Sequence, residues 1–550
     1  MGNYRFFLTS SLEKVFPDRM PEAMDPALPL TVFRGSRGAV QLVYYGDLMG
    51  EDPFRATFAL EVTGGPCRAV LRKVELIPSD FPAYAEADEY YITTKPGLFP
   101  DLLVPMEQPK IRVLHDQYRS IWIHFDVPET AAAGDYPVTI TMQGTSEVYH
   151  CGFTLRVPEA RLPKQTLIHT NWFHADCLAQ YYHVEPFSEA HWRIVENFIR
   201  FAVRDCGVNM LLTPVLTPPL DTAPDGERMT TQLVDIRVDQ GVYSFGFERL
   251  TRWVEICKNA GIEYLEIAHL FTQWGACNTP KVIAVVDGAA QRIGGNHIRA
   301  TSPEYGKFLT ALIPALREKL EELGYDRDHV YFHISDEPAV SQMESYRAAR
   351  DQVTKALEGC PVMDALSDME FYRSGLIEQP VAAVDHIQSF LDAEVPDLWA
   401  YYCCAQKVDV PNRFFAMESA RNRIMGVLLY RHNIKGFLHW GYNFYNSQYS
   451  IHPIDPYRMT HAEYAFPSGD AFLVYPGADG APLASIRGEV QMEGFVDLRA
   501  LRLLEARQER DTAEALLRED WGEKPMTFTD YPRDKNWLLR LRERLGAALG

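Results

Sequence analysis

The sequence predicts an α/β protein in which an antiparallel β-sandwich is followed by a (β/α)8, TIM-like barrel and a C-terminal helical segment. Three observations support this fold class. Residues 1–160 carry short β-rich runs separated by Gly, Pro and Asp, residues 161–485 alternate apolar runs with amphipathic stretches, and residues 486–550 have a charged, helical pattern. We therefore expect three domains with these boundaries, the last packed on the barrel.

The N-terminal segment has almost no helical periodicity. Its strand candidates are β-branched or alternating, as in an antiparallel sandwich. They are TVFRG, GAVQLVYY, ATFALEV, RAVLRKVEL, YRSIWIHFDV, DYPVTITM and VYHCGFTLRV. We interpret the acidic pair Asp88–Glu89, which lies between two of these runs, as an ordinary surface pair.

The barrel prediction depends on eight apolar runs that alternate with amphipathic helices. The runs are TLIHTNWF, NMLLTPVL, YLEIAHLF, VYFHIS, VMDALS, DHIQSF, LWAYYCC and GFLHWGYNF. Four helices are expected near residues 188–207, 246–262, 303–324 and 339–359, each closing on a Gly that suits a left-handed cap. A doubly wound open sheet is the competing architecture, but no GxGxxG or Walker sequence opens any of these helices.

Composition and charge exclude several classes of partner. Lys and Arg number 54 against 74 Asp and Glu, so the net charge is −20. Nucleic acids and anionic membranes select basic surfaces, so we expect neither as a partner. The N-terminus has no signal-peptide pattern, no apolar run approaches ~20 residues, and the nine cysteines are scattered, so a cytoplasmic protein with reduced thiols is expected. The sequence leaves open whether the chain forms a homo-oligomer.

Polar and aromatic residues gather where the predicted strands finish. In a (β/α)8 barrel these ends share one face, and sugar rings stack on Trp and Tyr while their hydroxyls need polar partners. We therefore expect a carbohydrate site there. Its candidate residues follow the first, third, fourth, seventh and eighth strands, and they are Trp172, His174, His269, Asp336, Glu337, Tyr401, Trp440 and Asn443.

The adjacent carboxylates Asp336 and Glu337 are the central feature of this site. Within a regular strand they would point to opposite faces, but Pro338 favours extended geometry at Glu337 and a strand that ends at Ser335. Both side chains then reach one ligand with coupled pKa values, one raised and one ionised. This pairing suits a glycosidase in which a 2-acetamido group of the substrate is the nucleophile. A solvated turn is the alternative interpretation.

Several motifs together resemble glycoside hydrolase family 123. They are SDEP after the fourth strand, LWAYYCC, GFLHWGYNFY and GDAFLVYPG…SIRGE. The resemblance implies a retaining, exo-acting β-N-acetylgalactosaminidase that uses substrate-assisted catalysis and no metal or cofactor. It also implies roles: Asp336 orients the acetamido group, Glu337 is the general acid/base and stays protonated beside an ionised Asp336, Tyr401 binds the acetamido carbonyl and Trp440 stacks on the sugar. An Arg and an Asp-x-Glu are expected after SIR, where this chain has Met492 and Asp497-Leu498-Arg499.

Several alternatives stay open at this point. Tyr401 and Trp440 would also suit simple packing, and His174 and His269 are interpreted as packing or hydrogen-bonding residues because no metal-ligand spacing surrounds them. Asp470 and Arg487 either bind sugar hydroxyls or pair within the fold. The substrate is expected to be a small oligosaccharide or glycoconjugate. The competing functions are an exo-glycosidase acting on β-galactosides or β-N-acetylglucosaminides, and a non-catalytic carbohydrate-binding barrel.

Overall fold

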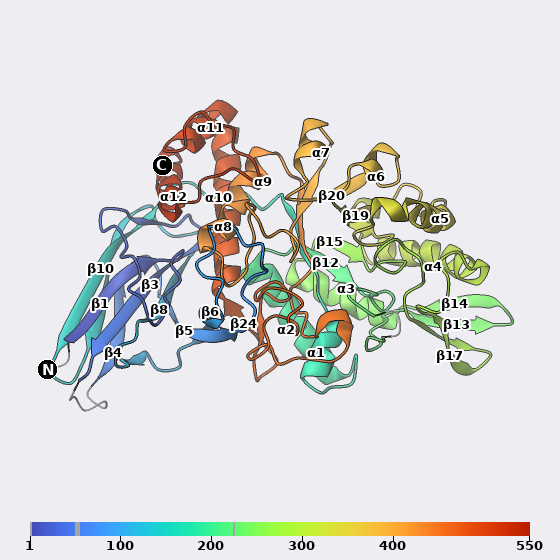
Figure 1. Ribbon diagram of the computed structural model, residues 1–550, viewed down its shortest axis with the longest axis horizontal. Helices are drawn as coiled ribbons and strands as arrows, with labels where there is room; N and C mark the ends of the chain where they lie inside the picture. Colours follow the sequence, from blue (N-terminus) through green and yellow to red (C-terminus); the bar gives the residue numbers. More distant parts are fainter. Residues whose placement is uncertain (1–2, 50–55, 224–225) are drawn as a thin grey trace. The chain divides into compact units, whose positions relative to one another are not determined.

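The computed structural model describes residues 3–49, 56–223 and 226–550 (Figure 1). The chain forms two compact units, each built from separated segments. The first comprises Met1–Gln165, Lys407–Arg431 and Leu483–Gly550, and the second comprises Thr166–Gln406 and His432–Pro482. No helix in the described part of the chain is long and apolar enough to cross a membrane. The units therefore differ from three consecutive domains, because 407–431 and 483–550 group with the N-terminal residues.

The first unit contains two largely antiparallel sheets. One has the order β1-β3-β8-β5-β6-β24 and the other the order β2-β10-β9-β4-β7. The first sheet uses β1 (Asn3–Ser10), β3 (Ser36–Asp47), β8 (Arg119–Val127), β5 (Val70–Ser79), β6 (Gly97–Pro105) and β24 (Pro482–Ser485). The second uses β2 (Leu30–Thr31), β10 (Val148–Val157), β9 (Gly134–Gln143), β4 (Thr57–Gly64) and β7 (Lys110–Arg112).

One hydrophobic core lies between these two sheets. Alternate residues of β8, including Ile121 and Ile123, pack in the same cluster as Ile140 and Met142 of β9. Because side chains alternate across a strand, each sheet presents one apolar face to this core. The expected antiparallel sandwich is thus confirmed, with β1, β6, β7 and β24 added to the predicted strands.

Helices complete the first unit. They are α8 (Ser419–Arg423), α9 (Met425–Arg431), α10 (Ile486–Gln508), α11 (Arg510–Arg518) and α12 (Lys535–Ala548), and α10 to α12 lie side by side (Figure 1). Ser485 caps α10 by accepting a hydrogen bond from the N–H of Gly488 (3.1 Å), which satisfies a donor that the first turn leaves open. Gly426 of α9 faces the carbonyl of Gly494, so any Cβ at this position would collide with α10.

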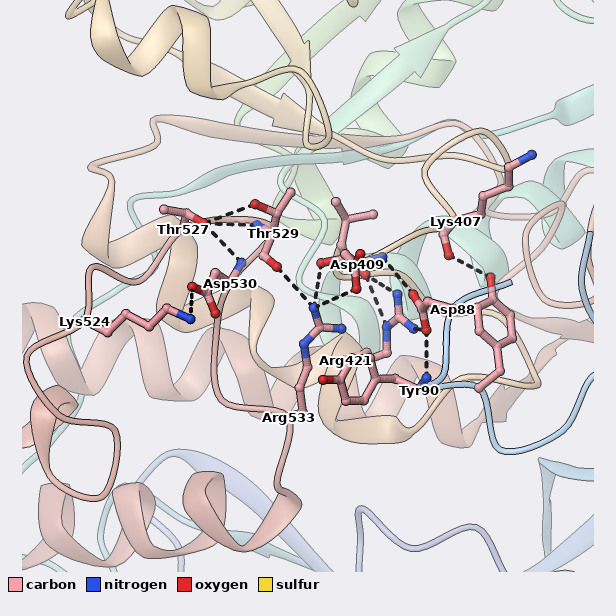
Figure 2. A network of polar contacts seen from close by, with 12 residues as sticks. Asp88, Tyr90, Lys407, Asp409, Arg421, Lys524, Thr527, Thr529, Asp530 and Arg533 are labelled. Carbon is pink, nitrogen blue, oxygen red and sulfur yellow. Dashed lines mark hydrogen bonds and ion pairs between the residues drawn. The ribbon is translucent and has the colours of Figure 1, made fainter. Parts of the chain in front are cut away.

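A buried ion pair ties segment 407–431 to the N-terminal part of the first unit (Figure 2). Arg421 donates to Asp88 Oδ1 (2.8 Å) and to the carbonyl of Val410 (2.7 Å), while the N–H of Asp409 donates to Asp88 Oδ2 (2.7 Å). The Asp88 and Arg421 side chains are only 6% and 1% exposed. Burial alone would raise the pKa of Asp88, but the charge and hydrogen bonds of Arg421 lower it. The interpretation of Asp88 as a surface residue is therefore wrong.

Removing this arginine should destabilise the first unit. Arg421→Ala would leave the Asp88 carboxylate buried without its cation, which costs about 3–5 kcal/mol of unfolding free energy. Urea unfolding followed by tryptophan fluorescence measures the change. The matched control is Arg200→Ala, which breaks the exposed pair with Glu196 (2.6 Å) and should cost no more than about 0.5 kcal/mol. Equal costs for the two variants would contradict a structural role for the Arg421 pair.

The second unit is built on a sheet of eight parallel strands. Their order is β18-β15-β12-β11-β22-β21-β20-β19. An isolated parallel bridge between Phe332 and Val362 joins the two ends of this order, so the sheet is a nearly closed barrel. The strands are β11 (Ile168–Asn171), β12 (Met210–Thr213), β15 (Tyr264–Ile267), β18 (Val330–Phe332), β19 (Met363–Leu366), β20 (Gln379–Ala383), β21 (Trp399–Tyr401) and β22 (Gly436–His439).

Seven of these strands lie within the predicted runs, and the sixth does not. The run DHIQSF, residues 385–390, was expected to be a strand, but the strand is β20 and α7 (Gln388–Asp392) covers part of the run. Pro380 makes this strand difficult to recognise in the sequence, because proline cannot donate a hydrogen bond to a neighbouring strand. It is tolerated because pairing of β20 with β21 begins only at Val381.

The four predicted helices are confirmed as α2 (Glu189–Cys206), α3 (Glu248–Ala260), α4 (Pro303–Glu322) and α5 (Met343–Val353). Gly207, Gly261 and Gly324 follow the last turns of α2, α3 and α4 with positive φ, as expected for left-handed caps. Gly359 also has positive φ, but α5 ends at Val353, so the expected closure of this helix on Gly359 is wrong. Shorter helices α1 (Ala175–Tyr181), α6 (Glu370–Arg373) and α7 occupy other connections. A small separate sheet of order β14-β13-β16-β17 comes from β13 (Asp235–Asp239), β14 (Val242–Gly246), β16 (Val282–Val286) and β17 (Ala289–Gly294), and it projects beside α4 (Figure 1).

Candidate active site

A pocket in the second unit collects five of the ten predicted site residues. Its atom-free space, including the part open to solvent, is about 690 Å3. Asp336, Glu337, Tyr401, Trp172 and Trp440 all line it. Further lining residues include Leu220, Asp221, Gln273, Trp274, Cys403, Gln448 and Phe466.

The carboxylate loop begins earlier than the sequence suggested. Strand β18 ends at Phe332, and residues 333–335 continue as buried coil to Asp336. Glu337 has φ = +44°, in the left-handed region, although extended geometry was expected before Pro338. That expectation is wrong, because the hydrogen bond from the N–H of Glu337 to the carbonyl of Ala365 (3.1 Å) helps to fix the turn. Non-glycine residues in such strained conformations cluster at functional sites.

Neighbouring side chains hold both carboxylates in place. The amide of Gln273 donates to Asp336 Oδ2 (2.6 Å), and the hydroxyl of Tyr401 donates to Glu337 Oε1 (2.6 Å). Asp336 is 5% exposed, while Glu337 is half-buried. The resemblance assigned Tyr401 to an acetamido carbonyl, whereas its hydroxyl here contacts the predicted general acid.

Burial dominates the electrostatics of this pair. Burial and the negative charge of Glu337 raise the pKa of Asp336 well above its usual range, while the Gln273 amide and the nearby His333 oppose the rise. Burial also raises the pKa of Glu337, against the hydrogen bonds from Tyr401 and Cys403. Two carboxyls in this situation retain a proton to higher pH than isolated ones, as acid catalysis near neutral pH requires. The raised pKa of Asp336 differs from the expectation that this carboxyl is ionised.

Two of the three tryptophans that line the pocket are fixed by buried carboxylates. Trp172 Nε1 donates to Glu266 Oε1 (2.7 Å), and Trp440 Nε1 donates to Asp470 Oδ2 (2.9 Å). Asp470 is fully buried, so it acts on the pocket through Trp440. An indole that is held at its N–H keeps its ring face available for stacking.

His174 and Asn443 lie behind Trp440 and bond to each other's segments. Asn443 Oδ1 accepts from the N–H of His174 (2.9 Å), and its Nδ2 donates to the His174 carbonyl (3.0 Å). His174 Nε2 lies 2.9 Å from the carbonyl of Trp440, and its Nδ1 lies 3.2 Å from Arg228 Nη2. Arg228 also forms a buried ion pair with Asp176 (2.6 Å). These residues position Trp440 from behind, and neither His174 nor Asn443 is among the pocket-lining residues.

His269 belongs to a buried cluster below the pocket. Its ring stacks on that of His333, with centroids 4.2 Å apart and an interplanar angle of 21°. His333 Nε2 lies 2.6 Å from Glu266 Oε1 and its Nδ1 lies 2.9 Å from Asp364 Oδ1. Possible donor atoms of His269, His333 and Asp364 lie within 4.8 Å of one another. Because both His333 nitrogens already face carboxylates and the stacked His269 ring lies in a nearly parallel plane, the cluster has the geometry of a buried ion pair.

Arg487 lies in the first unit. Its guanidinium makes a bidentate ion pair with Asp101, with two distances of 2.9 Å. Both side chains are 2% exposed. Of the two options for Arg487, pairing within the fold is therefore the one that the contacts support.

A comparison with protein families identifies the class of enzyme. Residues 172–504, well over half of the chain, match the model of the glycoside hydrolase 123 catalytic domain. The chain belongs to glycoside hydrolase family 123. It is therefore a glycoside hydrolase, and the matched region includes the carboxylate loop, Tyr401 and Trp440. No curated protein matches this family 123 hydrolase by sequence.

One solved structure supports the fold of this family 123 hydrolase. A family 123 glycoside hydrolase from Clostridium perfringens, described in work on glycolipid glycan hydrolysis, aligns with a TM-score of 0.72 at 13% identity, covering 100% of this chain and 98% of that one. An endo-β-1,4-mannanase from Thermotoga petrophila aligns with a TM-score of 0.33 at 12% identity, covering 62% and 78% of the two chains. The second likeness carries no argument.

The family 123 site also contains residues that the sequence argument missed. Gln273, which holds Asp336, directly precedes the tryptophan that ends the third strand's loop. Glu266, His333 and Asp364 were each visible as a charged or polar residue inside a largely apolar run. Such residues are rarely buried without partners, and this was the signal that could have identified them.

Proposed function

We propose that this family 123 enzyme is a retaining exo-glycosidase that releases terminal β-linked N-acetylgalactosamine by substrate-assisted catalysis. The proposal rests mainly on one observation, the adjacent carboxylates Asp336 and Glu337 in a single pocket. Two neighbours in sequence cannot easily flank a sugar ring from opposite sides, as an acid and a protein nucleophile must. A nucleophile within the substrate removes this requirement. We also assign the nearly closed sheet to the (β/α)8 barrel class.

The proposed reaction has two steps. In the first, the acetamido carbonyl oxygen of the substrate attacks C1, Glu337 gives its proton to the glycosidic oxygen, and the aglycone leaves. Asp336 accepts a hydrogen bond from the acetamido N–H and stabilises the cationic oxazolinium. In the second step, water attacks C1, Glu337 takes its proton, and the C1–oxygen bond of the ring intermediate breaks. Two inversions at C1 release the β-anomer of the sugar.

The substrate itself reconciles this role of Asp336 with its raised pKa. An acetamido N–H that donates to Asp336, and the positive charge that develops beside it, both favour the ionised carboxylate. The single proton that the two carboxyls hold then resides on Glu337, which gives it to the glycosidic oxygen. Since the C. perfringens relative was described for glycolipid glycans, we propose glycoconjugate glycans as the substrate class here too.

A panel of 4-nitrophenyl glycosides tests the proposed function. The 2-acetamido-β-galactoside should be hydrolysed, and NMR of the first product should show the β-anomer. The plain β-galactoside should react at least about 100-fold more slowly, because it lacks the nucleophile. Preference for the 2-acetamido-β-glucoside would correct the sugar but keep the mechanism. Equal turnover of the plain galactoside would overturn substrate assistance, and binding without any turnover would favour the non-catalytic alternative.

Two aromatic side chains at the pocket rim support a site for the next sugar of the glycan. Trp274 is 42% exposed, and its backbone N–H donates to the backbone carbonyl of Asp336 (3.0 Å). Tyr449 is 37% exposed, and its ring lies edge-on to that of Trp274 with the ring centroids 6.1 Å apart. Its backbone N–H donates to Asp221 Oδ2 (2.9 Å), which fixes the position of the residue. Exposed aromatic rings beside a polar pocket are suited to stacking on a sugar.

Trp274→Ala should therefore impair catalysis on substrates with a second sugar. We expect kcat/KM for a disaccharide ending in N-acetylgalactosamine to fall about tenfold, equivalent to ~1.4 kcal/mol. The corresponding glycosyl fluoride has no ring to stack and should react almost normally. Tyr464→Ala, which removes an aromatic ring that is 61% exposed and does not line the pocket, is the control and should change neither rate. Equal losses on both substrates would contradict stacking of the second sugar.

A further inference from the structure

Three buried residues below the pocket form a continuous charged bridge, which we call the His333 bridge: Glu266, His333 and Asp364. All three are 0% exposed. Each ring nitrogen of His333 faces one carboxylate, at 2.6 Å and 2.9 Å, a geometry that suits a doubly protonated ring. A buried ionic group of this kind is costly unless all of its members are paired, which this geometry achieves.

The two ends of the His333 bridge hold different walls of the site. Glu266, on β15, also accepts from Trp172 Nε1 (2.7 Å) and from the hydroxyl of Thr170. Asp364, on β19, accepts from the N–H groups of Ile334 and Ser335, both at 3.2 Å. These are the two residues that directly precede Asp336. The bridge therefore connects the Trp172 wall to the loop that carries the catalytic pair.

We propose that His333 is a positioning residue, which fixes Trp172 and the Asp336–Glu337 loop relative to each other and supplies the positive charge that keeps Asp336 ionised during the reaction. The second half of this inference rests on the proposed function. The first half depends only on the contacts of the bridge.

The charges around His333 support this role. Glu266 and Asp364 face it directly, the neutral His269 stacks on it, and Tyr346 donates to the far oxygen of Asp364 (2.5 Å). The hydrogen bonds and charges of the two carboxylates outweigh burial and raise the pKa of His333 to about 10, so it stays a cation throughout the working pH range. That cation lowers the pKa of Asp336, while the negative charge of Asp364 raises it. Removing the charge of His333 should therefore raise the pKa of Asp336, and removing the charge of Asp364 should lower it.

Two substitutions and the pH dependence of kcat test the inference. An ionised Asp336 is needed, so activity is lost as the pH falls through its pKa. His333→Gln should raise this acidic limb by about one pH unit, and Asp364→Asn should lower it. The basic limb, set by Glu337, should move less. His333→Gln should also reduce the plateau value of kcat by about tenfold, because the loop loses its support.

A matched control separates the loss of the His333 charge from a general loss of packing around a buried histidine. His191 is also a fully buried histidine of the second unit, but it bonds to the carbonyl of Ala175 (2.9 Å) and not to a carboxylate. His191→Gln should leave both limbs in place. The limbs are measured on whichever glycoside the panel identifies, so failure of the N-acetylgalactosamine assignment would not be mistaken for failure of the bridge.

Histidine 15N chemical shifts of the unsubstituted enzyme give a readout that needs no substrate. The His333 resonance should show two protonated nitrogens at pH 8. A neutral His333, or shifts of the acidic limb in the same direction in both variants, would overturn the inference. If His333→Gln does not fold, the direction of the shift in Asp364→Asn decides, because only an electrostatic role predicts that removing a buried carboxylate extends activity to lower pH.

Discussion

Asp336→Asn is expected to reduce kcat by about 100- to 1,000-fold, whichever leaving group the substrate carries. The amide keeps the shape of the side chain and its contact with Gln273, but it loses the negative charge that stabilises the oxazolinium. That charge is needed for formation and for breakdown of the intermediate, so a better leaving group should not rescue the variant. Rates on a series of aryl 2-acetamido-β-galactosides with phenols of different acidity measure this.

The opposite outcome would exchange the roles of the two carboxyls. A loss confined to substrates with poor leaving groups would mean that Asp336 is the proton donor. The strongly raised pKa of Asp336 and the hydrogen bond from Tyr401 to Glu337 would then be features of a pair with exchanged roles.

Glu337→Gln is expected to show the opposite pattern, a deficit that depends strongly on the leaving group. The amide cannot protonate the glycosidic oxygen, so alkyl and sugar aglycones should lose at least about 1,000-fold, while a dinitrophenyl glycoside should lose much less in the first step. Small anions such as azide should restore turnover of the dinitrophenyl substrate by replacing water, which needs a base, in the second step. Parallel leaving-group dependence in both carboxamide variants would contradict the assigned roles.

The sequence was informative wherever local patterns decide the structure. Helices α2 to α5 and seven barrel strands followed from periodicity and glycine caps, and the pocket brought together Asp336, Glu337, Tyr401, Trp172 and Trp440 as expected from strand ends. These features depend on residues that are close in the chain, or on a shared face that the barrel topology provides.

Features that depend on distant partners were not predictable in the same way. The burial of Asp88 depends on Arg421, more than 300 residues later, and Arg487 pairs with Asp101 in the same manner. The left-handed turn at Glu337 is fixed by a carbonyl on another strand, which overrides the local preference set by Pro338. In each case a tertiary contact outweighs a local tendency that the sequence reports correctly.

The division of the chain into units has a consequence for how the protein can be made. The chain leaves the first unit at residue 165, returns for 407–431, leaves again and comes back at 483. A ribosome therefore finishes the catalytic unit while the unit begun earlier still lacks α10, α11 and α12. The N-terminal sheets have to wait for residues 483–550 to emerge before their unit is complete. The matched region 172–504 contains pieces of both units, so expressing it alone should give an insoluble fragment, whereas the whole chain can close both.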